Sequence, residues 1–468
     1  MACRTHAAAG MAAADLHIMA ASRHDLEPGD AALREAVCRH AVPLRALDDV
    51  DAIVAQLADE PLVLLGEATH GTHEFYRLRA EISKRLIVEH GFDAVAVEAD
   101  WPDALRVSRW VQGLDGADNI DQALGAFERF PRWMWRNHDT RDFLLWLQRC
   151  NASRPGPSHR VGFFGVDLYS LGNSMQAVID YLEQADPRLA AQARQRYACF
   201  DSLAADPQRY GQATGYGLAD DCEPQVVEQL VSMLAHTGHL LNQDGADELF
   251  YAQQNARVVR GAEQYYRTLY RGGALSWNLR DTHMADTLDA LRDHLSAQRG
   301  RPAKIVVWAH NSHLGDAGAT EMGRQGQTNL GQLMRQRHGR AVFLLGFSTH
   351  TGTVAAARDW DAPVERRRVC SSLPGSVERL FHDAGLQRAL VPLRGPLHQP
   401  LAEPLLERAI GVIYRPDTER WSHYFETRLS QQFDAVVHVD HTHAVVPLDA
   451  FASQQPVAAE EETYPSGL

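Results

Sequence analysis

The chain has 468 residues, of which 45% are hydrophobic and 23% are charged, and this composition can bury a large core. Its formal net charge of −14 repels phosphate backbones and no run of basic residues offsets it, so we expect no nucleic-acid partner. No stretch approaches the roughly 20 apolar residues of a membrane helix, and charged residues interrupt the N-terminus where a secretory core would lie. We therefore expect a cytoplasmic protein with no membrane partner.

The six cysteines are spread along the chain without a CxxC pair. This spacing fits neither a disulfide framework nor a cysteine zinc site, and it is typical of a reducing compartment. Residues 1–25 and 451–468 are rich in small and polar residues, so we expect both ends to be disordered. One domain is expected between them, over residues 26–450. The sequence leaves the oligomeric state open.

Short apolar runs recur along the chain and predict strands. They are continuous instead of alternating, which indicates strands that are covered on both faces. Helical stretches separate several of them, so we predict an α/β fold with a parallel-sheet core flanked by helices. The runs are residues 62–66, 94–98, 161–166, 304–309, 341–347, 411–414 and 435–439.

Residues 73–90 predict a helix between the first two strands. Phe75, Leu78, Ile82 and Leu86 form one apolar stripe at helical spacing, and Gly91 follows as a C-cap. Two longer stretches depart from the strand pattern. Residues from about 175 to 300 contain no convincing strand and predict a helical insertion that forms a lobe over the active-site cleft. Residues 390–404 read as an irregular connection.

Titratable residues stand at the ends of four predicted strands. Glu67, Glu98, Asp167 and His310 each come at or directly after an apolar run. Because ligands of parallel α/β sheets bind at the carboxyl edge, this coincidence predicts a site there. For Asp167, capping of the following helix is an equally good interpretation.

His70 is the candidate general base. It lies in the turn before the helix, and a helix N-terminus disfavours an imidazolium. Glu67, three residues earlier, can fix its tautomer. Arg79 lies beside the apolar stripe of the helix and needs an anionic partner, which either Glu67 or Glu98 can supply. His310 or His313 would stabilise the oxyanion or protonate the leaving alkoxide.

Two other hypotheses stay open at this point. A metal-dependent hydrolase would use the pairs His70/His73 and His310/His313 as ligands, although neither pair has the spacing of a zinc-binding HExxH helix. A noncatalytic protein would use the same cleft to bind a small ligand. No Gly-x-Ser-x-Gly elbow, P-loop or strand-linked GxGxxG is present, so a His-activated water attacking a carbonyl is the simplest chemistry.

Several segments together resemble the erythromycin esterase family over roughly residues 40 to 448. They include GEATHGTHEFYRLR, AVAVEADWPDA, GVDLYSLGNSM, NLRDTHMADTL, WAHNSHLGD and the closing stretch from RAIGVIYRPD to AVVHVD. The resemblance implies an α/β core with a helical lobe over a deep cleft.

What the resemblance implies for chemistry is hydrolysis of an ester or lactone without a metal or other cofactor. By motif, His70 corresponds to the family's general base and Glu67 to its companion, while Arg79, Glu98, His310 and His313 correspond to the rest of its polar cluster. Characterised relatives open macrolide lactones, so antibiotic resistance is a family-level expectation and the partner is a small-molecule ester or lactone. The resemblance does not fix the natural substrate.

Overall fold

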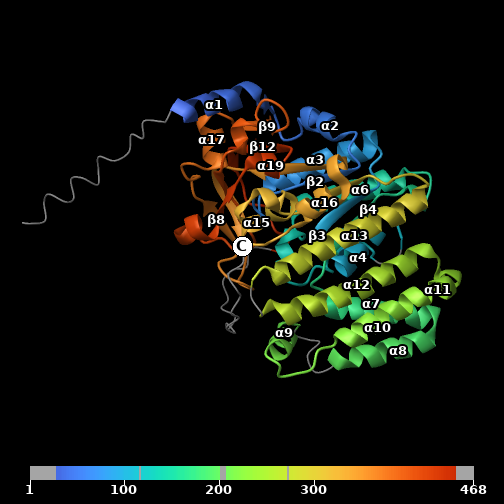
Figure 1. Ribbon diagram of the computed structural model, residues 1–468. Coiled ribbons are helices and arrows are strands. Elements are labelled where there is room, and N and C mark those ends of the chain that lie inside the picture. Colours follow the sequence, from blue (N-terminus) through green and yellow to red (C-terminus); the bar gives the residue numbers. More distant parts are fainter. Residues whose placement is uncertain (1–27, 115–116, 201–206, 271–272, 450–468) are drawn as a thin grey trace, which may run out of the picture.

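The computed structural model describes residues 28–114, 117–200, 207–270 and 273–449 (Figure 1). The ends that were predicted to be disordered, residues 1–25 and 451–468, lie outside the described residues. None of the described helices is both long and apolar enough to cross a membrane.

An eight-stranded sheet forms the centre of the described chain, in the order β1-β9-β12-β6-β2-β5-β3-β4. The stretch from β12 to β4 is parallel, and β9 and β1 add to its other edge in antiparallel fashion. The strands are β1 (Val42–Pro43), β2 (Leu62–Leu65), β3 (Ala94–Asp100), β4 (Gly162–Asp167), β5 (Ile305–Trp308), β6 (Val342–Ser348), β9 (Arg388–Pro392) and β12 (Ala435–Val439).

Both faces of this sheet are buried, as the continuous apolar runs predicted. Alternate residues of one strand enter different cores: Val63 and Leu65 of β2 pack on one side, Leu62 and Leu64 on the other. The helices that cover the two faces are α1 (Pro28–His40), α2 (Asp51–Leu57), α3 (His73–Glu89), α4 (Trp101–Val111), α5 (Ile120–Leu124), α6 (His138–Ala152), α13 (Leu275–Arg299), α16 (Leu330–His338) and α17 (Val377–Asp383). The predicted α/β class is confirmed.

Two predictions about strands are wrong. Residues 411–414 form no strand; this segment makes only an isolated bridge, from Ile413 to Ala357, and buries Tyr414 in a small separate cluster. The stretch from residue 390 is not irregular at its start, because it contains the second half of β9. Arginine and proline at the ends of this strand hid its short buried centre, Ala389 to Val391.

Two small sheets lie outside the main one. One pairs β10 (Leu405–Arg408) with β11 (Tyr424–Thr427), and the other has the order β13-β7-β8. Its strands are β7 (Thr351–Ala356), β8 (Glu365–Val369) and β13 (His441–Thr442). Short helices complete this part of the chain: α14 (Asn311–Leu314), α15 (Glu321–Arg324), α18 (Glu419–Ser422) and α19 (Leu429–Gln432).

Helix α3 follows the predicted pattern. The stripe residues Phe75, Leu78, Ile82 and Leu86 are all buried, and Gly91 adopts a positive φ of 68° just after the helix, which suits a residue without a Cβ. The turn before α3 packs tightly, because a Cβ at Gly71 would lie 1.9 Å from the carbonyl oxygen of Ala355. This close contact fixes the turn that carries His70.

Between β4 and β5 the described residues contain helices and no strand (Figure 1). These are α7 (Leu171–Ala185), α8 (Pro187–Tyr197), α9 (Pro207–Gly215), α10 (Glu223–Ala235), α11 (Thr237–Asp244), α12 (Ala246–Leu269) and α13. The segment from Leu168 to Leu269 has a hydrophobic core of its own. Helix α13 instead buries Met284, Leu288 and Leu291 against the sheet, so it connects the helical segment to the α/β core.

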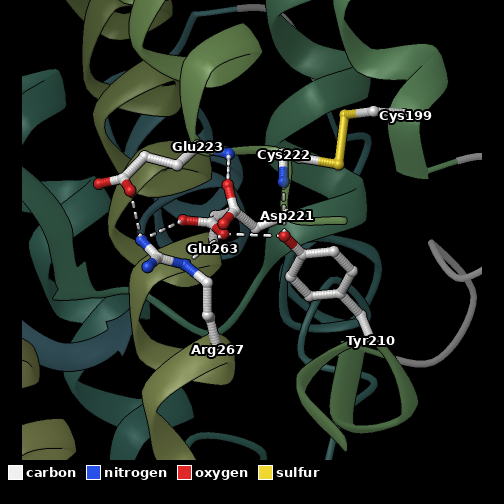
Figure 2. Close-up of a disulfide and its surroundings, with 7 residues drawn as sticks. All are labelled: Cys199, Tyr210, Asp221, Cys222, Glu223, Glu263 and Arg267. Atoms are coloured by element: carbon white, nitrogen blue, oxygen red, sulfur yellow. Dashed lines mark hydrogen bonds and ion pairs between the residues drawn. A yellow bond between two sulfur atoms is a disulfide. The ribbon is translucent and has the colours of Figure 1, made fainter. Parts of the chain in front are cut away.

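The structure contains a disulfide between Cys199 and Cys222 (Figure 2). The expectation that no cysteines pair is therefore wrong for these two, because spacing along the chain does not show which sulfur atoms meet in space. Hydrogen bonds connect the residues around the disulfide: the hydroxyl of Tyr210 accepts from the backbone N–H of Cys222 and donates to Glu263. Arg267, one helical turn further along α12, pairs with the same Glu263 carboxylate.

Candidate active site

A cavity of about 520 Å³ opens at the carboxyl edge of the main sheet. Its polar wall comes from the residues that follow neighbouring parallel strands, namely His70 after β2, Glu98 in β3, Asp167 at the end of β4, and His310 and His313 after β5. The sheet thus brings together side chains that are up to 243 positions apart, because parallel strands end at one edge.

His70 lies in a buried chain of three groups. Its Nδ1 is 2.9 Å from Oε1 of Glu67, and Oε2 of Glu67 accepts from Nη2 of Arg79 at 2.6 Å. All three residues are at least nine-tenths buried. Since a carboxylate at Nδ1 requires a proton there, the neutral ring keeps the lone pair of Nε2 for the cavity.

Arg79 therefore has Glu67 as its partner, one of the two that its position allowed. Its guanidinium also stacks over Tyr76 and Trp308, at 4.6 and 5.2 Å from the ring centroids. Arg79 does not line the cavity. It neutralises the carboxylate that orients His70, and it lies behind the residues that form the cavity wall.

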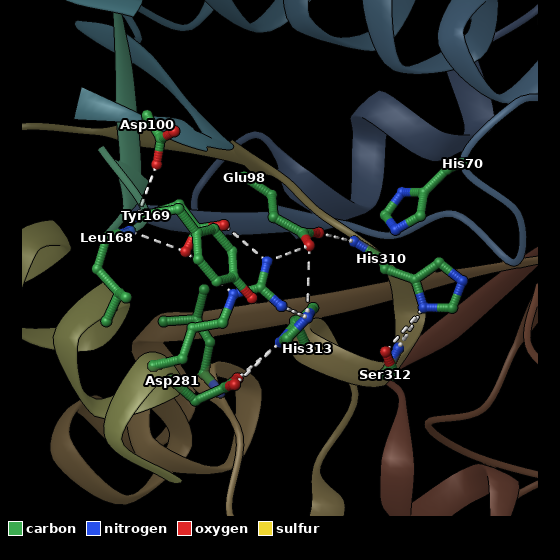
Figure 3. Close-up of polar contacts among 12 residues, drawn as sticks. His70, Glu98, Asp100, Leu168, Tyr169, Asp281, His310, Ser312 and His313 are labelled. Carbon is green, nitrogen blue, oxygen red and sulfur yellow. Dashed lines mark hydrogen bonds and ion pairs between the residues drawn. The ribbon is translucent and has the colours of Figure 1, made fainter. Parts of the chain in front are cut away.

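Glu98 occupies the centre of the polar wall (Figure 3). It accepts from Nη2 of Arg280 at 2.7 Å and from the backbone N–H of His310 at 2.9 Å. His313 Nε2 lies 3.4 Å from the same carboxylate. Burial opposes ionisation, but His313 and Arg280 outweigh it and hold the pKa of Glu98 well below its usual range.

His310 is a neutral hydrogen-bond donor by its contacts. Its Nδ1 accepts from the backbone N–H of Ser312 at 3.2 Å, so the proton of the neutral ring is on Nε2. Burial, together with repulsion from His70, lowers its pKa well below the ordinary value. The ring centroids of His310 and His70 are 4.8 Å apart.

His313 is held by α13. Its Nδ1 lies 2.9 Å and 3.0 Å from the two carboxylate oxygens of Asp281, and its ring stacks on Trp277 with centroids 4.5 Å apart. Nη1 of Arg280 lies 3.0 Å from Nε2. The sequence reasoning singled out His313 but neither Asp281 nor Trp277.

Arg280 is the main residue that sequence reasoning missed. It binds Asp167 through Nε and Nη2, at 3.0 and 2.7 Å, and binds Glu98 with the same Nη2. Asp167 does not cap the helix that follows, since α7 begins at Leu171 after Ser170. The available signal was the position of Arg280 and Asp281 in NLRDTHMADTL, one of the segments that carry the family resemblance.

His73 lies apart from the cavity. Its Nδ1 is 2.8 Å from Asp139 and its side chain is 40% exposed. The side chains of His70 and His73 therefore do not meet in a common site. In the part of the chain that the structure describes, no group of three or more His, Cys, Asp or Glu side chains is arranged to hold a metal ion.

The other walls of the cavity are largely aromatic. Trp421 on α18 lies at the cavity and is 84% exposed, and Trp360 packs edge-on against Phe130. Asp103 and Asp100 also line the cavity, and burial together with the neighbouring Asp100 raises the pKa of Asp103 to about 7. The cavity therefore offers an apolar surface beside its polar wall.

Comparison with known proteins matches the erythromycin esterase family model to residues 87–442. Erythromycin esterase type II of Escherichia coli is 22% identical over 419 residues, which cover 84% of this chain and 92% of that protein. A putative hydrolase, YbfO, of Bacillus subtilis (strain 168) is 22% identical over 433 residues, 86% of this chain and 89% of its own. The solved structure of an erythromycin esterase mutant, EreC, in its open conformation superposes with a TM-score of 0.63 at 17% identity, covering 86% and 96% of the two chains.

Proposed function

The chain belongs to the erythromycin esterase family, and on that premise we propose that it hydrolyses a carboxylic ester or lactone with a water molecule that His70 activates. The relatives named as esterases and as a hydrolase support the reaction class. One observation carries the mechanism: the Arg79–Glu67–His70 chain, which presents an imidazole lone pair to the cavity.

In the proposed reaction, Nε2 of His70 takes a proton from water as the water oxygen attacks the carbonyl carbon. Glu67 keeps the ring in the required tautomer and stabilises the imidazolium that forms. The water adds directly, so no covalent enzyme intermediate is needed. Arg79 pairs with Glu67 and so compensates the charge of this buried carboxylate.

His310 is suited to stabilise the oxyanion of the tetrahedral intermediate. A neutral ring with its proton on Nε2 donates a hydrogen bond without losing that proton to the intermediate. Glu98 accepts from the backbone of His310 and so fixes the start of this segment at the end of β5. The ring centroids of His70 and His310 are 4.8 Å apart, so both could reach one carbonyl group, His70 through the attacking water and His310 at the carbonyl oxygen.

A macrolide lactone is the substrate we propose to test first. Two curated relatives from Escherichia coli are named erythromycin esterases, of types II and I. The cavity of about 520 Å³ lies within the usual range of about 300–1,000 Å³ for small-molecule sites, and its aromatic walls suit a large ring with a mainly apolar body.

The test is a mass-spectrometric screen of macrolides and other esters and lactones for the gain of one water. We expect His70→Asn to slow hydrolysis of any substrate found by about 10²–10⁴-fold, the usual contribution of a general base. His73→Asn is the matched control, because this neighbouring histidine lies outside the cavity, and we expect it to keep wild-type activity.

Other outcomes would replace the proposal. A fully active His70→Ala enzyme would remove His70 from the reaction. Stoichiometric bound metal, with loss of activity on chelation, would make the protein a metal-dependent hydrolase instead. Saturable binding of a lactone without hydrolysis of any compound in the screen would make it a binding protein.

A further inference from the structure

One carboxylate in the cavity wall has no cation beside it. Asp103, in the first turn of α4, lines the cavity and is 8% exposed. Its Oδ1 accepts from Nδ2 of Asn173 at 3.5 Å, and within the described chain neither oxygen has another hydrogen-bond partner or an ion pair. Resting on the proposed function, we infer that Asp103 binds a positively charged amine of the substrate, so that the substrate class is an ester or lactone that carries such an amine.

The other carboxylates that line the cavity are already neutralised. Each has an oxygen within 3.1 Å of an arginine nitrogen, and the pairs are Glu98 and Asp167 with Arg280, Asp100 with Arg129, and Asp359 with Arg415. Arg132 also lines the cavity, but it is exposed, and no ion pair joins it to Asp103 in the described part of the chain. Among the described residues of the wall, Asp103 is thus the carboxylate whose charge is left for a ligand.

Helix capping does not explain a carboxylate at this position. A carboxylate in the first turn of a helix often accepts from the free backbone N–H groups there. In the residues that the structure describes, Asp103 accepts from none of these groups. Asp100 accepts from the backbone N–H of Tyr169 and from Arg129, and no hydrogen bond joins it to Asp103 within that same part of the chain (Figure 3). Apart from the long contact with Asn173, the local hydrogen bonds therefore do not use the Asp103 carboxylate.

A cation at Asp103 would offset an electrostatic penalty. Burial disfavours the charged carboxylate and repulsion from Asp100 adds to this effect, so the pKa of Asp103 rises to about 7. The Asn173 amide and Arg129 oppose the rise, whereas Glu128 adds to it. A bound ammonium group stabilises the charged form, so such a group binds more tightly above this pKa than below it.

The cavity suits an organic cation better than a metal ion. A metal ion needs several ligands, and no group of three or more His, Cys, Asp or Glu side chains is arranged to hold one in the described residues. A single carboxylate in a cavity with aromatic walls suits an alkylammonium group, which has one charge and carbon substituents that contact apolar surface. His70 lines the same cavity, so one substrate can place its carbonyl group at His70 and its amine at Asp103.

Two series of esters of the same acid test this inference. In one series the alcohol ends in a trimethylammonium group, and in the other it ends in the neutral tert-butyl group of the same shape. The chain between this group and the ester increases in length within each series. At the length that reaches Asp103, we expect the ratio of KM for the neutral ester to KM for the charged ester to be about tenfold higher in wild type than in Asp103→Asn.

The design separates the cation contact from other effects of the substitution. Each ratio compares two substrates of one enzyme preparation, so it does not depend on the fraction of folded protein. Asp121→Asn is the matched control, because it removes the same charge from an exposed residue outside the cavity that pairs with Arg141. We expect this variant to keep the wild-type ratio.

The ratio should also depend on pH. The trimethylammonium group keeps its charge at every pH, so a change in the ratio reports a titrating group of the enzyme. In wild type we expect the ratio to rise several-fold between about pH 6 and about pH 8, as the Asp103 carboxyl loses its proton. Asp103→Asn should lose this rise.

A ratio that is the same in wild type and Asp103→Asn at every chain length would overturn the inference. Failure of the proposed function differs, because wild type would then hydrolyse neither series. Calorimetric binding replaces KM in that case: the ratio of Kd for the neutral and the charged ester, in wild type and in Asp103→Asn, decides whether Asp103 binds the cation.

Discussion

The two halves of the candidate site use the same kinds of groups but are assembled in opposite ways. In the half formed by β2 and α3, Glu67, His70 and Arg79 lie within 12 positions of one another. In the half formed by α13, Arg280 reaches Glu98 across 182 positions and Asp167 across 113. The first arrangement lies within one turn and the helix that follows it, whereas the second exists only when the helical segment has packed α13 onto the sheet.

The two halves of the site should contribute differently to stability. The Glu67–His70 contact joins residues that are near one another in any conformation of the turn. The contacts of Arg280 join the helical segment to two strand ends and add to the packing of α13 on the sheet. Substitutions in the α13 half should therefore disturb stability and activity together.

The largest loss in the free energy of unfolding should come from Arg280→Met, and it should exceed the loss from Arg79→Met. Both remove a cation with little or no solvent exposure and take its charge away from buried carboxylates, which costs about 3–5 kcal/mol in comparable pairs. We expect Arg280→Met at the upper end of this range, because two carboxylates lose their cation, and Arg79→Met at the lower end. Urea unfolding measures both.

Arg85→Met serves as the control, since Arg85 on α3 makes only exposed ion pairs, with Glu89 of the same helix and Asp51 of α2, and its removal should change the midpoint little. Equal destabilisation by all three substitutions would abolish the distinction between the two halves.

The dependence of stability on acid gives a further test of this distinction. The folded-state pKa of Glu98 is depressed, so the stabilisation from its charge is present above the unfolded-state pKa and is lost as pH falls. Arg280→Met should weaken this acid sensitivity.

The opposite pH dependence is expected from His313. Its folded-state pKa is raised, so the stabilisation is full below the unfolded value of about 6.5 and is lost as pH rises through the folded value. Urea unfolding between about pH 6 and pH 9 should show wild type losing more stability than His313→Gln. His338→Gln, which alters a solvent-accessible pair with Asp289, should retain the wild-type slope. Parallel slopes for wild type and His313→Gln would contradict the raised pKa.

The smallest effect should come from Trp421→Ala, which touches neither half. This side chain is 84% exposed at the cavity, so its removal should leave stability unchanged. We expect KM for a large lactone to rise about threefold to tenfold, which corresponds to about 1 kcal/mol of aromatic contact, with kcat retained. A small ester should show no change in KM. A fall in kcat for both substrates would instead place Trp421 in the catalytic arrangement.

Residue patterns were informative where a structural feature depends on neighbours in the chain. The stripe of α3 and the strands with continuous apolar runs follow from periodicity and burial, and they were predicted with nearly correct bounds. The pattern failed at residues 411–414, an apolar segment that buries side chains without joining the sheet. It also failed at β9, where burial is confined to the centre of the strand.

In the candidate site, too, the residues that were predicted are those whose contacts depend on neighbours in the chain. GEATH predicted the contact between Glu67 and His70, and the following helix predicted that Arg79 pairs with Glu67 or Glu98; the structure gives Glu67. The predicted position of Glu98 at a strand end was also useful, but residue patterns did not identify the cation that binds it. That residue, Arg280, lies on a helix that periodicity assigned to an insertion, and its place in NLRDTHMADTL was the available signal.

The sequence by itself determined the α/β class, the local arrangement of the proposed base and the presence of titratable residues at strand ends. These depend on periodicity, turn geometry and the shared edge of parallel strands. Only the tertiary structure decided that Arg280 joins Glu98 to Asp167, that Asp281 holds His313, and that Cys199 meets Cys222. Such pairs are selected by the packing of whole helices against a sheet, and the free energy of that packing comes from many residues that are far apart in the chain.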